Sequence, residues 1–152
     1  MFTLNLAPAL FPDRTEVLMS GGFGELRKKV LVVDDYDDLR AVTKRALEGC
    51  GYTVFEAENG EEAISLAQSA LPDLILMDLS MPNLDGFTAI HRIRRLLGLG
   101  DVPIIAVSAH AAKEVREDAL AAGCREFLLK PVSHERLTQA VARYLRPQGQ
   151  DD

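Results

Sequence analysis

The chain has 152 residues, 47% of them hydrophobic, and a formal net charge of −6 at pH 7. This length and composition predict a single domain whose hydrophobic core needs no disulfide or metal support. The negative charge argues against a general nucleic-acid-binding protein, because contacts with phosphates need a basic surface.

Two cysteines, Cys50 and Cys124, are too few for a disulfide framework and favour a reducing compartment, the cytoplasm. We interpret both as small, buried or half-buried apolar residues.

Residues 1–26 differ from the rest of the chain because they have no periodic apolar pattern. Pro8 and Pro12 interrupt their one apolar stretch, so neither a signal peptide nor a membrane segment is predicted. We interpret these residues as a flexible or weakly docked extension. Whether translation starts at Met1 or at Met19 stays open.

From Lys28 onward, short apolar runs alternate with helical patterns. The first run, over 30–33, ends in two aspartates and predicts a strand. A helix is expected over 37–49, with Asp37 as its N-cap. Its apolar residues share one face: Leu39, Val42, Ala46 and Leu47.

The next elements repeat this alternation. A strand is expected over 53–57, followed by a helix whose start resembles a capping box made by Asn59 and Glu62. The third strand, over 74–77, ends at an aspartate. The helix after it is expected over 86–97, with three residues facing inward: Phe87, Ile90 and Leu97.

The last two units follow the same plan. A strand over 102–107 ends in a serine, and a weakly amphipathic helix is expected over 113–121. A strand over 127–129 ends in a Lys-Pro pair, and a final helix is expected over 133–146. Strands that are apolar on both faces belong in a parallel sheet covered by helices on each side. The sequence therefore predicts an α/β fold, a doubly wound three-layer sandwich with right-handed crossovers.

In such a sheet, ligands bind at the carboxyl ends of the strands. Close carboxylates repel one another unless a cation neutralises them, and Mg²⁺ combines one or two carboxylates with waters and a phosphate. An aspartate can also attack phosphorus and form an aspartyl phosphate, while lysine and hydroxyl donors stabilise the transferred oxygens. The residues predicted at this edge are Asp34, Asp35, Asp78, Ser108 and Lys130.

Four segments at successive strand ends resemble the receiver domains of two-component response regulators. They are VLVVDD (Val30 to Asp35), DLILMDLSMPNLDG (Asp73 to Gly86), IIAVSA (Ile104 to Ala109) and Lys130-Pro131. The resemblance covers Lys28 to Arg146, and we divide the chain into an extension (1–26), a receiver domain (27–147) and a C-terminal tail (148–152). It implies a flavodoxin-like sheet of five strands in the order 2-1-3-4-5 with five helices.

The resemblance makes Asp78 the phosphoacceptor, phosphorylated by a histidine kinase or a phosphotransfer protein. It implies that Mg²⁺, with Mn²⁺ as an alternative ion, is bound by Asp35 directly, by Asp34 largely through water, by Asp78, and by the backbone carbonyl of Ser80. Ser108 and Lys130 would each bind a phosphoryl oxygen. The peptide bond between Lys130 and Pro131 is expected to be cis.

The resemblance also implies a switch. Phe127 occupies the position of the switch aromatic, although core packing is an equal alternative for it. Movement of Ser108 toward the phosphoryl group would let Phe127 turn and would reshape the face formed by helix 113–121, the fifth strand and the last helix. Ser80 and His110 occupy positions that tune dephosphorylation, with a plain loop role as the alternative for His110.

We expect a single-domain regulator that acts through a downstream protein target, as a monomer or a phosphorylation-dependent dimer, without direct nucleic-acid contact or membrane insertion. An excised fragment of a larger regulator is an alternative origin. A phosphorylation-independent interaction module is an alternative function, but the complete acidic pocket argues against it. An aspartate-nucleophile hydrolase needs a second aspartate where this chain has Ser80. A flavodoxin-like cofactor site is disfavoured because Asp34 and Asp35 stand where a flavin phosphate needs donors.

Overall fold

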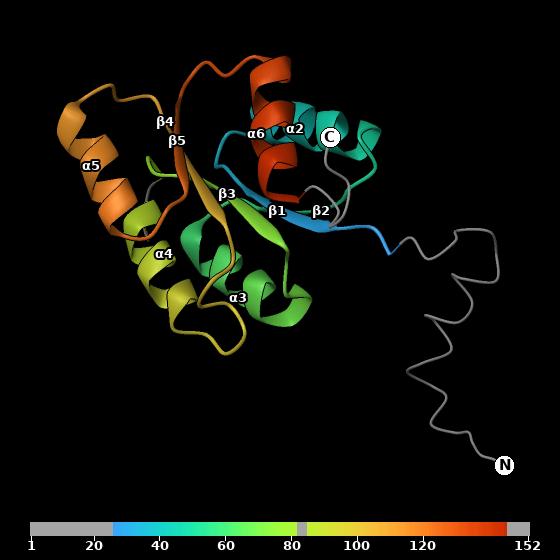
Figure 1. Ribbon diagram of the computed structural model, residues 1–152, viewed down its shortest axis with the longest axis horizontal. Coiled ribbons are helices and arrows are strands. Elements are labelled where there is room, and N and C mark those ends of the chain that lie inside the picture. Colours follow the sequence, from blue (N-terminus) through green and yellow to red (C-terminus); the bar gives the residue numbers. More distant parts are fainter. Residues whose placement is uncertain (1–25, 82–84, 146–152) are drawn as a thin grey trace, which may run out of the picture.

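The structure, a computed structural model, describes residues 26–81 and 85–145. Five parallel strands form one sheet in the order β2-β1-β3-β4-β5, which confirms the predicted topology. The strands are β1 (Lys29–Val33), β2 (Thr53–Ala57), β3 (Leu74–Asp78), β4 (Ile104–Ser108) and β5 (Glu126–Leu129). The helices are α2 (Asp37–Gly49), α3 (Gly60–Ala70), α4 (Gly86–Arg94), α5 (Lys113–Ala121) and α6 (His134–Leu145) (Figure 1).

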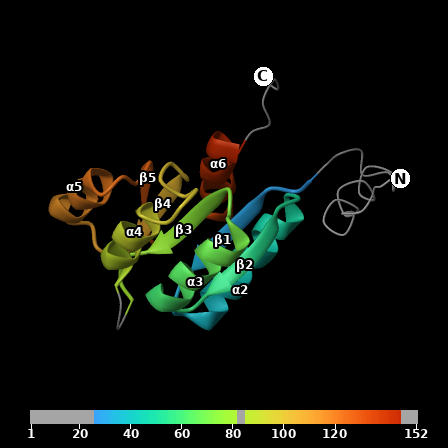
Figure 2. The same ribbon diagram turned by 90° about the horizontal axis from the view of Figure 1, so that it is seen from below.

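The helices cover both faces of the sheet, with α2 and α6 on one side and α3, α4 and α5 on the other (Figures 1 and 2). Successive residues of the central strand β3 enter two different hydrophobic clusters. Ile75 and Met77 belong to the cluster under α3, α4 and α5, whereas Leu74 and Leu76 belong to the one under α2 and α6. Side chains alternate across a strand, so a strand buried on both faces must be apolar throughout.

The carboxyl ends of the strands meet at one edge, and backbone pairing continues one residue beyond them. The amide of Asp34 donates to the carbonyl of Ala57 at 3.1 Å, and the amide of Leu79 donates to Val107 at 2.9 Å. The amide of Lys130 donates to the carbonyl of Ser108 at 2.8 Å. The residues that follow the strands therefore belong to the rigid part of the sheet.

Helix α2 differs from its prediction in the residues that it buries. Leu47 is buried, but Leu39 and Val42 are 39% and 59% exposed. The N-cap is Tyr36 instead of Asp37, and no side chain caps the helix. The apolar spacing identified the helix correctly. Its first turns nevertheless leave these two apolar side chains open to solvent.

Of three further predictions, one is confirmed and two are wrong. Asn59 caps α3 as expected, with its Oδ1 accepting from the amide of Glu62 at 2.8 Å. Leu97 was predicted to face inward but is 96% exposed, because α4 ends at Arg94 and the chain turns away at Gly98, where φ is 86°. Cys50, expected to be at least half buried, is exposed after the end of α2.

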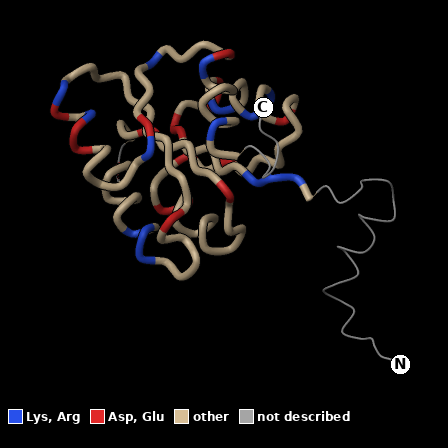
Figure 3. The backbone as a smooth tube through the Cα atoms, viewed as in Figure 1, with Lys and Arg blue, Asp and Glu red and all other residues tan. Residues whose placement is uncertain are grey.

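The predictions for the extension before residue 26, for Met19 and for the tail over 148–152 lie outside the described residues. In the ranges 26–81 and 85–145, none of the helices combines the length and the apolar character that crossing a bilayer requires. Acidic and basic residues are interspersed over the helices of this part of the chain (Figure 3).

Gly86, the first residue of α4, lies directly against the end of β3. A Cβ atom at this position would overlap the carbonyl oxygen of Asp78 and would lie 2.7 Å from the Cα of Leu79. Both are backbone atoms, so neither moves aside without disturbing the strand end. The absence of a side chain at Gly86 is therefore what lets α4 begin beside Asp78.

We predict that Gly86→Ala lowers the free energy of unfolding by about 1–3 kcal/mol, the usual range for overpacking. Gly49→Ala is the matched control, because a Cβ atom at Gly49 would meet nothing within 4 Å. Its expected change is within about 0.5 kcal/mol, as for most surface substitutions. Urea unfolding of the two variants measures both values. Equal stabilities would contradict the close approach of α4 to β3.

Candidate functional site

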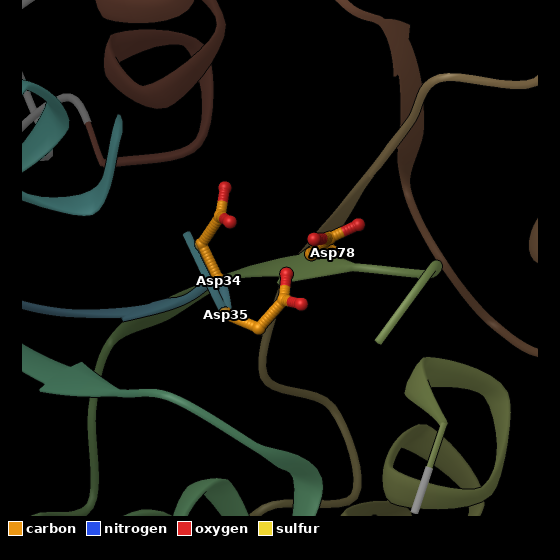
Figure 4. Close-up of side chains that lie close together, drawn as sticks. All are labelled: Asp34, Asp35 and Asp78. Carbon is orange, nitrogen blue, oxygen red and sulfur yellow. The ribbon is translucent and has the colours of Figure 1, made fainter. Parts of the chain in front are cut away.

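The carboxyl edge of the sheet brings together three aspartates from two adjacent strands. Asp34 and Asp35 follow β1, and Asp78 is the last residue of β3. One carboxylate oxygen from each lies within 4.8 Å of those of the other two (Figure 4). Asp78 is only 2% exposed and Asp34 is also buried, whereas Asp35 is open to solvent.

Lys130 reaches the same cluster from the far edge of the sheet. It follows β5, which β4 separates from β3. Its Nζ atom lies 3.3 Å from Oδ2 of Asp78 and 3.4 Å from Oδ2 of Asp34. The peptide bond between Lys130 and Pro131 is cis. The structure thus places one ammonium between two carboxylates that are far apart in the sequence.

The cluster has more negative than positive charge. Burial raises the pKa of the Asp78 carboxyl and the negative charge of Asp34 adds to the rise, although the amide of Ser80 and the ammonium of Lys130 oppose it. Within residues 26–81 and 85–145, Asp35 makes no ion pair, so one ammonium faces three carboxylates. A hard divalent cation with oxygen ligands fits this donor set, and Mg²⁺ is the common choice where a phosphate joins the site.

Two short turns orient the polar side chains at the strand ends. The amide of Ser80 donates to Oδ1 of Asp78 at 2.9 Å, and the amide of His110 donates to Oγ of Ser108 at 3.0 Å. In both turns, the amide two residues past a strand-end side chain holds it in place. Ser108 is fully buried, whereas Ser80 and His110 are exposed. The exposed pair can therefore contact water beside the cluster.

Phe127 lies within β5 and is buried in the cluster under α3, α4 and α5. The guanidinium carbon of Arg116, on α5, lies 5.9 Å from the centre of its ring, a distance typical of a cation–π contact. The core-packing role of Phe127 is therefore observed. Its role as a switch stays a prediction.

A cavity of about 430 Å³ opens beside the carboxylates. Asp34, Asp78 and Lys130 contribute to its lining, together with the apolar side chains of Leu39 on α2 and Leu137 on α6. This surface was not predicted, because the apolar residues of α2 were all expected to share one face packed on the core. Its signal in the sequence was Leu39, an apolar residue only four positions after Asp35.

The comparisons with known proteins agree with this geometry. A family model described as a response regulator receiver domain matches residues 30–142. An uncharacterized 14.6 kDa protein of Leptolyngbya boryana is 41% identical over 115 residues, which cover 76% of this chain and 88% of that protein. The chemotaxis protein CheY of Bacillus subtilis is 35% identical over 118 residues, which cover 77% of this chain and 97% of that protein.

Other relatives are longer than the matched region. The chain spans 47% of a probable transcriptional regulator, ycf27, of Guillardia theta, and 15% of the sensor histidine kinase CheAY of Helicobacter pylori. Among solved structures, the receiver domain of sensor histidine kinase PA1611 from Pseudomonas aeruginosa PAO1 is similar with a TM-score of 0.73 at 33% identity. The match covers 80% of this chain and 99% of that one. That structure has a magnesium ion coordinated in its active site cleft.

We predict that Asp78→Asn raises the melting temperature by a few degrees at pH 7 in buffer without divalent ions. Because burial raises the pKa of Asp78 in the folded protein, its charged form destabilises the fold at pH values above that pKa. This penalty is relieved as the pH falls through the folded pKa toward the ordinary value of 3.8. The advantage of the asparagine variant should therefore shrink in acid.

Thermal unfolding at several pH values measures this difference. Asp118→Asn is the matched control, because Asp118 is exposed on α5. It should leave the melting temperature almost unchanged throughout. Two results would contradict the prediction: a melting temperature of Asp78→Asn below that of the wild type at pH 7, or a difference between the two that does not vary with pH. Either would show that burial of the charged Asp78 carboxylate does not destabilise the fold.

Proposed function

Because the chain belongs to the family of response regulator receiver domains, we propose that it accepts a phosphoryl group on Asp78 from a histidine kinase or a histidine phosphotransfer protein. The observation that carries the proposal is the convergence of Asp34, Asp35 and Asp78 with the ammonium of Lys130. Such a site favours the binding of a cation and of phosphoryl oxygens together.

In the transfer, a carboxylate oxygen of Asp78 forms a bond to phosphorus while the bond from phosphorus to the donor atom breaks. The donor atom, a histidine nitrogen in a protein donor, leaves with the electron pair of that bond. The amide of Ser80 and the ammonium of Lys130 hold the two oxygens of Asp78 and so orient the nucleophile. Mg²⁺, held by the three aspartates and the backbone carbonyl of Ser80, would neutralise charge on the transferred group.

Lys130 and Ser108 are the proposed ligands of the phosphoryl oxygens. Oγ of Ser108 accepts its hydrogen bond from the amide of His110, which leaves the hydroxyl proton available for donation. Hydrolysis would then end the signal, when water attacks phosphorus, the bond from phosphorus to the aspartyl oxygen breaks, and the Asp78 carboxylate returns. In this proposal the chain is a signalling phosphoacceptor that assists only the phosphorylation and dephosphorylation of its own aspartate.

The proposed output is a changed protein-binding face. Phosphorylation adds charge and acceptor oxygens at the sheet edge. Ser108 would move toward the new group, and Phe127 would respond within the face formed by α5, β5 and α6. A ligand shifts such an equilibrium only by its different affinity for the two states.

We propose that this signalling takes place in the cytoplasm, without direct contact with nucleic acid and without insertion into a membrane. The protein would act as a monomer or as a dimer formed on phosphorylation.

Incubation with acetyl phosphate and MgCl₂, followed by intact mass measurement, tests the proposal. We expect one acid-labile phosphoryl adduct in the wild type and none in Asp78→Asn. Lys130→Ala should form the adduct about 100-fold more slowly, the usual loss when one charged or polar donor is removed. Lys113→Ala is the matched control, because Lys113 is exposed on α5, and should react at the wild-type rate.

One alternative function has a distinct outcome. A phosphorylation-independent interaction module would form no adduct and would not bind a beryllofluoride–Mg²⁺ complex, which mimics a phosphoryl group. Failure of both experiments in the wild type would overturn the proposal in favour of that module. Binding of beryllofluoride without transfer from acetyl phosphate would support a donor restricted to a kinase or phosphotransfer protein.

We predict that His110→Ala changes the lifetime of the aspartyl phosphate by about 3-fold or more, an effect of about 0.7 kcal/mol on the hydrolysis barrier. The alanine keeps the amide that donates to Ser108 and removes only the exposed imidazole beside the cluster. Decay of the mass adduct measures the lifetime. His134→Ala, exposed at the start of α6, should leave it unchanged. Equal lifetimes in all three proteins would remove His110 from the mechanism.

A further inference from the structure

Arg40, on the first turn of α2, uses three donors on three separate parts of the fold. Its Nη1 donates to the backbone carbonyl of Asp34 at 2.7 Å and its Nη2 to Oδ1 of Asp37 at 2.7 Å. Its Nε donates to Oε1 of Glu56, on β2, at 3.2 Å. The side chain is only 14% exposed. Arg40 therefore links the loop after β1 to its own helix and to the neighbouring strand.

The contact with Asp34 concerns the peptide group that joins Asp34 to Asp35. A peptide group is planar, so fixing its carbonyl oxygen also fixes the amide nitrogen of Asp35. Asp34 itself is held at three further points: its amide donates to the carbonyl of Ala57, and its carboxylate accepts from the amide of Tyr36 at 2.9 Å and pairs with Nζ of Lys130 at 3.4 Å. Asp35 has a solvent-exposed side chain. The direction of that side chain therefore depends on the peptide group before it.

We propose that Arg40 is a positioning residue for the divalent cation site. By holding the peptide group between Asp34 and Asp35, it keeps the two carboxylates and that of Asp78 converged before an ion binds. The inference rests on the proposed function for the identity of the ion, but it concerns a residue that does not belong to the carboxylate cluster. Residues that orient metal ligands typically change metal affinity 10- to 100-fold when they are replaced.

The chemistry of arginine explains the choice of residue at this position. A planar guanidinium offers several donors in fixed directions, so one side chain can bind a carbonyl and two carboxylates at once. Lys44, one turn further along α2, has a similar charge and also pairs with Glu56, at 3.4 Å. Within the part of the chain that the structure describes, Lys44 makes no hydrogen bond or ion pair with Asp34. Replacing each of the two residues in turn therefore distinguishes the effect of positioning on cation binding from the effect of charge.

The test measures Mg²⁺ binding by Arg40→Met and Lys44→Met, with titration of amide NMR signals as the readout. Each variant loses one positive charge on α2, and loss of charge alone would strengthen cation binding. We expect Arg40→Met to weaken Mg²⁺ binding about 10-fold or more. Lys44→Met should bind as tightly as the wild type or slightly more tightly. Arg40→Lys, which keeps the positive charge but loses the planar guanidinium, should lie between the wild type and Arg40→Met.

The outcomes are distinguishable from failure of the proposed function, because Mg²⁺ binding needs no phosphoryl transfer. Unchanged or tighter binding by Arg40→Met would overturn the positioning role, even if Asp78 is phosphorylated. Equal weakening in Arg40→Met and Lys44→Met would also overturn it, since a general loss of stability would then be the cause. Thermal unfolding of each variant verifies that it is folded at the temperature of the titration.

Discussion

Three carboxylates share one ammonium at the carboxyl edge of this sheet, and one of them, Asp78, is almost completely removed from water. Burial without full charge compensation costs free energy, which is why the pKa of Asp78 is raised. The arrangement is a direct result of parallel topology, because every strand ends at the same edge. A cation and a phosphoryl group would both act on this unbalanced charge. Under the proposed function, the repulsion among the three carboxylates, which destabilises the fold, also makes the fold respond to phosphorylation.

The scaffold resists this repulsion through its backbone. Pairing continues past the ends of β1, β3 and β5, so the residues at the site cannot move apart by fraying. The carbonyl of Asp78 lies against Gly86 at the start of α4, which leaves that strand end no space to shift. On the other side, Arg40 holds the carbonyl of Asp34. Sites whose ligands are held on rigid elements bind with little loss of conformational freedom.

The path from the site to the proposed output face is short. In the register of β4 and β5, Ser108 lies opposite Leu129, and Ala106 lies opposite Phe127. Ser108 and Phe127 are therefore side chains on neighbouring strands, separated by two positions. Under the proposed function, a small displacement of the buried Ser108 would be passed to Phe127 across these two neighbouring strands. Arg116, whose guanidinium lies over the ring of Phe127, is on α5 and links Phe127 to the outer surface of the proposed output face.

The alternation of apolar runs and helical patterns was enough to predict the order and type of the elements. The aspartates at the ends of the first and third strands and the lysine after the fifth were enough to predict the charged side chains that gather at the edge. Local pattern could not decide which helix faces are covered, so the exposure of Leu39, Val42 and Leu97 was not foreseen. Nor could it assign Arg40 its partners, because Asp34 and Glu56 approach it only through the packing of α2 on the sheet.

The sequence by itself determined the strands, their common edge and the acidic character of the site, since these follow from hydrophobicity and chain connectivity. Only the tertiary structure decided burial, charge compensation and positioning, because these depend on distances between residues remote in the chain.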